Sequence, residues 1–305
     1  MNKPSPPVIS VLLATRNRSR DLARALETLA RAATPLGEAV EVLLIDNGST
    51  DSSALVIENF FRQTPVAGCA LSVGERGKAR ALNRGLQAAR GEVLAFTDDD
   101  VEVPPGWLSA AYRFACEDRH YAAATGPVRL PPHVHDREIL ERVRLLRTLP
   151  LFDLGPSRQE TKHLYGCNMV VRRQALERIG GFDERLGPGA SGLHEDGDVA
   201  RRLRAAGERI LYLPELEMFH TVDPERLTWE FFVALHHADA RSRFVRDGNR
   251  GLFYALRHWL GAVFVWSGWL LLGNRARRTR AYGRLVYHAE YARLAWQTLR
   301  RHARA

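Results

Sequence analysis

The sequence predicts an α/β protein whose mostly parallel sheet is flanked by helices. Two observations favour this class. Short apolar runs rich in β-branched residues alternate with segments whose apolar residues recur every three or four positions. Three of these runs also end in polar residues, and parallel strands bring their carboxyl ends to one edge of a sheet, where ligands bind. With 305 residues, 45% of them hydrophobic, the chain can bury such a core and carry an appendage.

The first strand and helix lie close to the N-terminus. The apolar run at residues 8–14 predicts a buried strand, which ends at Thr15, Arg16, Asn17 and Arg18. Serine commonly caps helices, and we expect Ser19 to cap the helix that follows. Helical spacing predicts that this helix buries Leu22, Ala25, Leu26 and Leu29.

A second unit of the same kind follows. Residues 40–45 are strand-like, and residues 46–51, Asp-Asn-Gly-Ser-Thr-Asp, form a turn rich in side-chain acceptors. The next helix is expected over residues 52–61. Its predicted face consists of Leu55, Val56, Asn59 and Phe60.

The third unit ends in the aspartate triplet Asp98, Asp99 and Asp100, directly after the apolar run at 93–96. Three adjacent carboxylates at a strand end need a cation or strong donors nearby, and a divalent metal that holds a phosphorylated substrate would supply one. An acidic solvent loop is the alternative. The chain has no GxxxxGK[ST] loop and no GxGxxG segment, which disfavours a P-loop NTPase and a dinucleotide-binding dehydrogenase.

Six segments between residues 8 and 225 resemble the family 2 glycosyltransferases, which use nucleotide sugars and have the Rossmann-like GT-A fold. Residues 44–51 are similar to the D-[DN]-G-S-x-D motif that contacts uracil, and residues 91–100 to the strand that carries the family's DxD. The other segments are 10–18, 77–85, 180–184 and 194–196, in the family's order. The resemblance implies an inverting transferase with a GT-A sheet and a helical C-terminal extension.

The resemblance also implies roles for individual residues. Asp196 corresponds to the catalytic base, while Asp100 and His220 correspond to ligands of a divalent metal, Mn²⁺ or Mg²⁺. Trp107 and Glu195 are candidate acceptor-side residues. The positions implied to bind the donor are Thr15, Arg16, Asn17, Asp46, Asn47, Arg80, Asn83, Asp98 and Asp99. Asp46 favours a UDP-sugar, although thymine and guanine offer a comparable N–H donor.

Each of these roles has a structural alternative. A lone histidine after a strand, such as His220, is often structural, and an aromatic residue in the first turn of a helix, such as Trp107, is often core. Arg80 could lie on a solvated helix face. Acids near a helix N-terminus, such as Asp196, are favoured by the helix dipole whatever their function.

The chemistry of sugar transfer explains why such residues are needed. Charge develops on the β-phosphate as the nucleotide leaves, so a cation must stabilise it. The acceptor hydroxyl is a poor nucleophile and needs a base, and direct attack assisted by one carboxylate inverts the anomeric centre. The glycine-rich segment 187–192 precedes the presumed base and is a candidate lid, and residues 127–166 predict an irregular insertion with a helix over 137–149.

The C-terminal region is strongly basic. Residues 241–305 hold 14 arginines and two acids, a net charge of +12, so the first 240 residues carry −3 of the total of +9. We therefore predict a glycosyltransferase domain over 1–240 and a basic helical tail over 241–305. Within the tail, residues 252–273 are apolar apart from Arg257, His258 and Ser267. They are followed by Arg275, Arg277, Arg278 and Arg280.

Three hypotheses apply to this tail. No nucleic-acid-binding module is visible, so nucleic acid is not an expected partner. An uncharged stretch of 16 residues, 259–274, is short for a transmembrane helix. Helices that lie on an anionic membrane surface fit best, and packing against the chain's own domain or in a homodimer is the alternative.

Localisation and the general class of reaction complete the prediction. Three cysteines without CxxC spacing and the absence of an apolar N-terminal segment favour a reducing compartment, so the protein is expected in the cytoplasm, peripheral to the inner face of the cytoplasmic membrane. The QxxRW motif of processive synthases is absent. We expect a non-processive transfer to a glycan or glycolipid acceptor. A catalytically inert nucleotide-sugar-binding scaffold subunit and a nucleotidyltransferase are the alternatives.

Overall fold

The computed structural model describes residues 6–302, and its chain divides into two compact units. The sheet unit contains the chain up to residue 131, together with residues 150–184 and 195–221. The helical unit contains residues 132–149 and 185–194 and the chain from residue 222 onward. The predicted domain boundary at 240/241 differs from this division, since it falls inside helix α8 (Trp229–Asp247). The outermost residues of both predicted domains, 1–5 and 303–305, lie outside the described residues.

The sheet unit is built on an eight-stranded sheet of order β3-β2-β1-β4-β9-β6-β10-β8. Its first four strands are parallel, as the alternation of strands and helices predicts, and β9 pairs antiparallel with β4 and β6. The strand bounds are β1 Ile9–Thr15, β2 Val40–Asp46, β3 Gly68–Ser72, β4 Val93–Thr97, β6 Ala123–Thr125, β8 Gln159–Glu160, β9 Met169–Arg172 and β10 Ile210–Tyr212. A small second sheet has the order β5-β11-β7, with bounds Val101–Glu102, Met218–His220 and Val128–Arg129.

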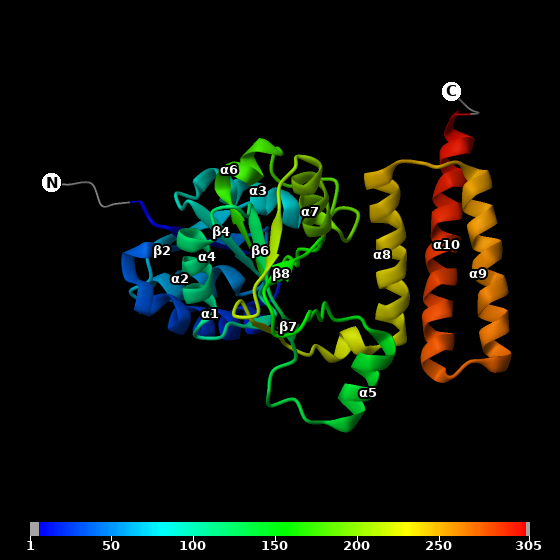
Figure 1. Ribbon diagram of the computed structural model, residues 1–305, viewed down its shortest axis with the longest axis horizontal. Helices are drawn as coiled ribbons and strands as arrows, with labels where there is room; N and C mark the ends of the chain where they lie inside the picture. Colours follow the sequence, from blue (N-terminus) through cyan, green and yellow to red (C-terminus); the bar gives the residue numbers. More distant parts are fainter. Residues whose placement is uncertain (1–5, 303–305) are drawn as a thin grey trace. The chain divides into compact units, whose positions relative to one another are not determined.

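Helices cover both faces of the large sheet (Figure 1). One face packs against α1 (Ser19–Ala33), α2 (Ser53–Gln63) and α4 (Trp107–Glu117), and the other against α3 (Lys78–Ala88), α6 (Arg173–Arg178) and α7 (Glu195–Ala205). A 3₁₀ segment, η1 (Thr34–Ala39), connects α1 to β2. The apolar side chains of alternate strand residues therefore enter two separate cores. The polar residues at the strand ends lie beyond these cores, at the edge of the sheet.

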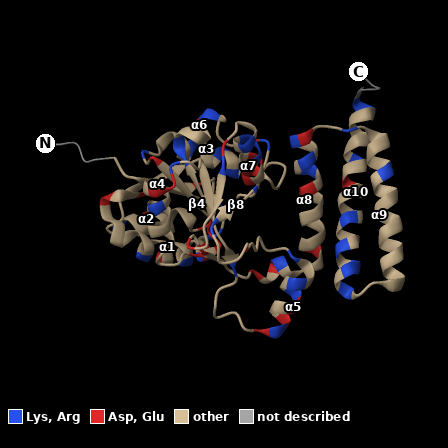
Figure 2. Cartoon of the chain, in the orientation of Figure 1, with Lys and Arg blue, Asp and Glu red and all other residues tan. Residues whose placement is uncertain are grey.

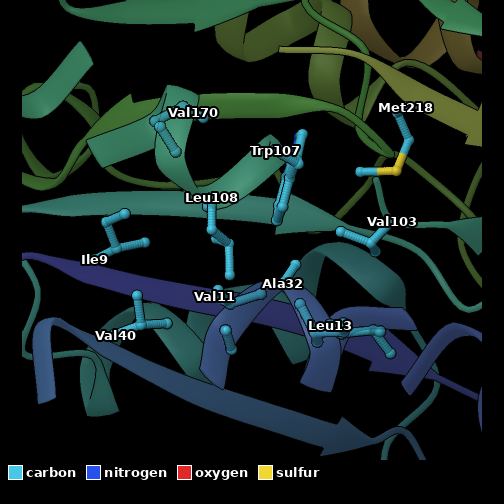
Figure 3. Close-up of a cluster of buried hydrophobic side chains, with 14 of the residues drawn as sticks. Ile9, Val11, Leu13, Ala32, Val40, Val103, Trp107, Leu108, Val170 and Met218 are labelled. Atoms are coloured by element: carbon cyan, nitrogen blue, oxygen red, sulfur yellow. The ribbon is translucent and has the colours of Figure 1, made fainter. Parts of the chain in front are cut away.

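Trp107 belongs to the core on the first of these faces (Figure 3). Its side chain is 0% exposed, and its indole N–H donates to Asn168 Oδ1 at 2.8 Å. The prediction of an acceptor-facing Trp107 is therefore wrong. The first turn of α4 lies over the sheet, where the large ring contributes more by burial than it could at a solvent edge.

The predicted cap of α1 is wrong, and the predicted face of α2 is right at Phe60 and wrong at Leu55. Ser19 is the first helical residue rather than the cap, and its backbone N–H donates to Asp51 Oδ2 at 3.0 Å. In α2 the buried residues are Ser53, Ile57 and Phe60, whereas Leu55 is 54% exposed. That face follows from positions i, i+4 and i+7 of a helix that begins at Ser53.

The helical unit contains three long helices, α8 (Trp229–Asp247), α9 (Leu252–Leu272) and α10 (Arg275–His302). Helix α10 lies between the other two (Figure 1). The short helices η2 (Pro224–Leu227) and α5 (Arg137–Leu146) complete the unit. Helix α5 ends three residues before its predicted end, because Arg147 adopts a left-handed conformation with φ of 54°.

Helix α9 exposes many apolar side chains. Phe264 and Leu271 are 81% and 83% exposed, and only 11% of the most apolar window of the helix is buried. By length and composition alone this helix could cross a membrane. Arginines gather along α10, whereas α9 carries few charged residues (Figure 2).

Candidate active site

Three strand ends meet at one edge of the sheet, as the sequence predicts. Thr15 at the end of β1 pairs in register with Asp46 at the end of β2, and β4 delivers the aspartate triplet beside β1. Thr15 Oγ1 donates to Asp99 Oδ2 at 2.6 Å, which links the first and third strand ends directly. The carboxylates of the triplet thus lie next to the loop that follows β1.

Two cations compensate the triplet. Arg18 Nη1 lies 3.0 Å from Asp100 Oδ2 and 3.6 Å from Asp99 Oδ1, while Lys78 Nζ lies 2.5 Å from Asp98 Oδ1. Burial, followed by the neighbouring carboxylate of Asp100, raises the pKa of Asp99 to about 7. Arg18 and Lys78 thus supply two positive charges to three carboxyl groups. The site is therefore suited to receive a further cation.

The residues near Asp100 fit a divalent metal. His220 Nε2 lies 3.4 Å from Asp100 Oδ1, and His220 Nδ1 lies 2.8 Å from the carbonyl oxygen of Thr221. If Nδ1 donates to that carbonyl, the Nε2 side of the ring faces the carboxylate, and a histidine whose second ring nitrogen bonds a carbonyl is the usual form of a metal-binding histidine. Between residues 6 and 302 no group of three metal-ligating side chains is present. The chain would thus supply two ligands, and phosphate oxygens and water would complete the coordination shell.

The loops after β1 and β2 are joined by hydrogen bonds. Asn17 Oδ1 accepts from the Thr50 N–H at 2.7 Å, and Asp46 Oδ1 accepts from the Ser49 N–H at 3.0 Å. Arg16 Nη1 donates to the carbonyl of Asn47 at 2.7 Å. These contacts bring together four of the residues implied to bind the donor and leave them beside the sheet edge.

Asn47 itself has a structural role. Its Nδ2 donates to the carbonyls of Val73 and Glu75, and its Oδ1 accepts from the Gly77 N–H. The side chain is buried, and its amide is used by the segment that leads into α3. Asn47 therefore positions this segment, and its contact to the donor stays a prediction.

Arg80 and Asn83 contact the segment 180–184. Arg80 Nε donates to Glu184 Oε2 at 3.0 Å, and Asn83 bonds both the N–H and the carbonyl of Phe182. Both side chains therefore fasten the Gly-Gly-Phe-Asp-Glu segment, residues 180–184, to α3. Because an α-helix turns by about 100° per residue, Arg80 and Asn83 lie on a different face of α3 from Lys78, the first residue of the helix.

Lys78 connects the triplet to the proposed catalytic helix. Its Nζ lies 3.6 Å from Glu195 Oε1, in addition to its contact with Asp98. Burial alone would lower the pKa of Lys78, but the carboxylates of Asp98 and Glu195 raise it. Burial has the opposite effect on Glu195, whose pKa it raises, and Lys78 opposes that rise. The ammonium group is thus held charged between two acids from different elements.

Asp196 is held by backbone groups. Its Oδ2 accepts from the Gly166 N–H at 2.7 Å and its Oδ1 from the Gly197 N–H at 2.6 Å. A Cβ placed on Gly166 would lie 3.5 Å from Asp196 Oδ2 and 3.6 Å from Lys78 Nζ, so the carboxylate and the ammonium group converge on this glycine. The side chain is half-buried and therefore accessible from solvent.

Sequence reasoning missed Lys78 and Arg18 as site residues, although both lie in segments that it singled out. One signal was available for Lys78. The chain has only three lysines among 44 basic residues, and Lys78 follows Gly77 at the start of a helix. The compact ammonium group fits between two carboxylates in a way that a planar guanidinium does not.

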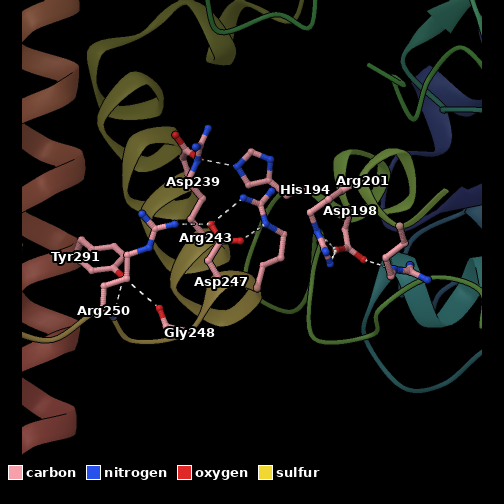
Figure 4. A network of polar contacts seen from close by, with 11 residues as sticks. His194, Asp198, Arg201, Asp239, Arg243, Asp247, Gly248, Arg250 and Tyr291 are labelled. Atoms are coloured by element: carbon pink, nitrogen blue, oxygen red, sulfur yellow. Dashed lines mark hydrogen bonds and ion pairs between the residues drawn. The ribbon is translucent and has the colours of Figure 1, made fainter. Parts of the chain in front are cut away.

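The proposed lid, residues 187–192, is fastened within the helical unit. The Gly187 N–H donates to the Leu193 carbonyl, and the Leu193 N–H donates to Ser242 Oγ on α8 at 2.9 Å. His194 adopts a left-handed φ of 75° and its Nε2 lies 2.5 Å from Asp239 Oδ1 (Figure 4). These contacts to α8 distinguish the segment from the free lid that its glycine content predicts.

Residues 10–180 match the family described as Glycosyl transferase family 2, and this match covers more than half of the chain. The chain therefore belongs to glycosyl transferase family 2, and it is a glycosyltransferase.

The chain is similar to two curated relatives and to one solved structure. The chain is 27% identical to the succinoglycan biosynthesis protein ExoM of Rhizobium meliloti, over 89% of this chain and 88% of that protein. It is 26% identical to the pre-mycofactocin glycosyltransferase of Mycobacterium tuberculosis, over 86% of this chain and 53% of that protein. The fold is similar to that of a mannosyltransferase from Pyrobaculum calidifontis in complex with GDP-Man and Mn²⁺. The TM-score is 0.64 and the identity 20%, over 96% of this chain and 88% of that one. This likeness supports the GT-A fold.

Proposed function

We propose that this chain is an inverting, non-processive glycosyltransferase that moves a sugar from a nucleoside diphosphate sugar to a hydroxyl of a lipid-linked or cell-envelope glycan. The observation that carries this proposal is the position of Lys78, which contacts Asp98 and Glu195 and lies near Asp196. One side chain thereby links the aspartates expected to meet the donor phosphates with the carboxylate expected to act as base.

In the proposed step, Asp196 takes the proton of the acceptor hydroxyl while that oxygen attacks the anomeric carbon. A new carbon–oxygen bond forms as the bond to the β-phosphate oxygen breaks, and the nucleoside diphosphate leaves. Attack from the face opposite the leaving group inverts the anomeric centre. Asp196 is suited to this role because two backbone N–H groups fix its orientation and its side chain is half-buried.

A divalent cation bound by Asp100 and His220 would neutralise charge on the donor's diphosphate. In the same region the Arg18 guanidinium, 3.0 Å from Asp100, can turn toward a phosphate oxygen when the carboxylate binds a metal. Asp46, at the end of β2, is the residue we propose for recognition of the nucleotide base, with uracil favoured. The Mn²⁺ named for the Pyrobaculum structure is consistent with a metal at this site, whereas its GDP-Man carries guanine in place of uracil.

A cell-envelope acceptor is supported by the relationship to a succinoglycan biosynthesis protein. The exposed apolar face of α9 and the arginines of α10 support a peripheral location on an anionic membrane. Together they favour an acceptor that is itself attached to lipid.

A donor screen tests the proposal. Full-length protein is heated with UDP, GDP, dTDP and their sugars, with and without Mn²⁺, and the binder is then used in a transfer assay with the anomer of the product read by NMR. A donor that raises the melting temperature only with metal, and whose sugar appears in the inverted configuration, supports the proposal. Retained configuration would contradict the inverting step. Binding without any turnover would favour the scaffold alternative, and release of diphosphate from a nucleoside triphosphate would favour a nucleotidyltransferase.

A further inference from the structure

The helical unit contains a cavity of about 590 Å³. Helix α8 contributes Phe232 and Leu235, and α9 contributes Val265 and Trp269, so one part of the wall is apolar. Helix α10 contributes three arginines, Arg277, Arg280 and Arg284. Their spacing of three and four residues places them on one face of that helix. The cavity is therefore amphipathic, with hydrocarbon on two helices and positive charge on the third.

The positive charge in this cavity is not cancelled by its acid. Asp239 is the carboxylate among the lining residues, and it accepts from His194 and from Arg243 Nε at 2.8 Å (Figure 4). Although burial raises the pKa of Asp239, these two donors lower it overall, so the carboxylate stays ionised and paired. Within residues 6–302, neither the Arg280 nor the Arg284 guanidinium forms a hydrogen bond or an ion pair. Two guanidinium groups thus remain available to an anion.

The apolar wall continues onto an exposed surface. Val265 is itself 38% exposed, and Leu272, two turns along the same face of α9, is 86% exposed. Arg277 lies over the Trp269 ring, with its guanidinium carbon 4.9 Å from the centroid, so charge and hydrocarbon adjoin at the cavity itself. A ligand with an anionic head and a long apolar chain would match both surfaces.

We propose that this cavity binds the phosphate or diphosphate group of a phosphorylated lipid, with the hydrocarbon chain against α8 and α9. The inference rests on the proposed function in one respect, since it names the lipid part of the acceptor as the occupant. A planar guanidinium bonds two phosphate oxygens at once, which favours phosphate over a single charged oxygen. The apolar wall favours a lipid over free phosphate or nucleic acid.

Direct binding by the full-length protein tests this site. Farnesyl diphosphate, farnesol and inorganic diphosphate are titrated calorimetrically in the presence of EDTA, so that metal-dependent binding near Asp100 does not contribute. Farnesyl diphosphate is expected to bind more tightly than either of the other two. The Arg280→Gln/Arg284→Gln double variant is expected to lose at least about tenfold in affinity for it, because each charge-assisted hydrogen bond is worth about that factor.

Two further variants make the test specific. Arg257→Gln/Arg300→Gln removes the same charge from exposed positions of α9 and α10 outside the cavity and should keep wild-type affinity. Trp269→Ala should weaken binding of farnesyl diphosphate while leaving inorganic diphosphate unchanged. Unchanged affinity in the Arg280/Arg284 variant would overturn the proposal, as would inorganic diphosphate binding as tightly as farnesyl diphosphate.

Donor binding separates this proposal from the proposed function. The Arg280→Gln/Arg284→Gln and Arg257→Gln/Arg300→Gln variants should both bind the nucleotide donor with Mn²⁺ as the wild type does. The residues proposed to bind the donor lie in the sheet unit. If no nucleotide sugar binds while the lipid results hold, the lipid site stands and the proposed function fails. If the donor binds and transfers while Arg280 and Arg284 have no effect on the lipid probe, the lipid site fails alone.

Discussion

Lys78 Nζ lies 2.5 Å from Asp98 Oδ1, so the first residue of α3 neutralises the first carboxylate of the aspartate triplet. Both side chains are largely buried, at 16% and 21% exposure. The same ammonium group also faces Glu195. Its removal would therefore leave two carboxylates from different elements without their cation.

We expect Lys78→Met to destabilise the protein by about 3 kcal/mol, because a buried ion pair that loses one partner leaves an uncompensated charge. Urea unfolding followed by circular dichroism measures this change. Lys162→Met is the matched control, since Lys162 is exposed and its loss should change the free energy of unfolding by less than about 0.5 kcal/mol. Equal stability of the two variants would show that Lys78 does not stabilise these carboxylates.

Asp196→Asn should abolish transfer while it leaves donor affinity nearly unchanged. The carboxamide keeps the size of the side chain but cannot take the hydroxyl proton, and a positioned base contributes about 10²–10⁴-fold to the rate. Single-turnover transfer and calorimetric donor binding are compared for this variant and for Glu195→Gln. Glu195 is buried against Lys78, so its variant should retain much more activity. If the two variants lost activity in the reverse order, Glu195 would take the role of base.

Asp100→Ala and His220→Gln should each remove the metal-dependent part of nucleotide binding, since the two side chains are proposed to share one cation. Calorimetry of UDP with Mn²⁺ and with EDTA measures that part, and Mn²⁺ paramagnetic resonance measures the metal directly. Asp46→Ala should weaken nucleotide binding and still take up Mn²⁺. His120→Gln, at an exposed histidine, is the control. Equal UDP affinity with and without metal in the wild type would argue against the assignment.

Asp51→Ala should destabilise the sheet unit by about 1 kcal/mol, as expected for loss of a helix cap. Its Oδ2 accepts from the Ser19 N–H at the start of α1, and its Oδ1 accepts from the N–H and hydroxyl of Ser53 at the start of α2. Exposed Glu38→Ala provides a control that should leave stability nearly unchanged. The measurement is the free energy of unfolding in urea.

The Asp51 contribution should depend on pH in a defined direction. The hydrogen bond from Ser53 lowers the pKa of Asp51 from 3.8 to about 2 in the folded protein. The stabilisation is therefore fully present above the unfolded value and is lost as the pH falls from 3.8 toward 2. The difference in stability between wild type and Asp51→Ala should shrink over that range. A difference that grew as the pH fell would contradict the capping role.

Helix α9 should carry membrane binding. Full-length protein is expected to sediment with anionic vesicles and to be released only partly by high salt, because salt screens the arginines but not the apolar burial. Phe264→Gln/Leu271→Gln should lower the partition coefficient by about tenfold or more. Leu55→Gln, an exposed apolar position in the sheet unit, should have no effect. Protein that ignores vesicles and forms dimers in solution would show instead that this face is a subunit interface.

The sequence determined the fold class and the convergence of the strand ends. Alternating strand and helix patterns predict the parallel strands β1, β2 and β4, and parallel strands necessarily end at one edge of the sheet. The contact between Thr15 and Asp99 is the direct result. Both features depend on local periodicity and chain direction, which a single sequence records.

Only the tertiary structure decided how individual polar side chains are used. Asn47 and Asn83 lie in recognisable segments, yet both amides bond backbone groups of neighbouring segments. Lys78 acquired its role because folding brings α3, β4 and α7 together around one ammonium group. Trp107 entered the core because α4 packs over the sheet. Such roles depend on contacts between residues far apart in the chain. Neither the spacing of residues nor the composition shows which of these residues will contact each other in the folded protein.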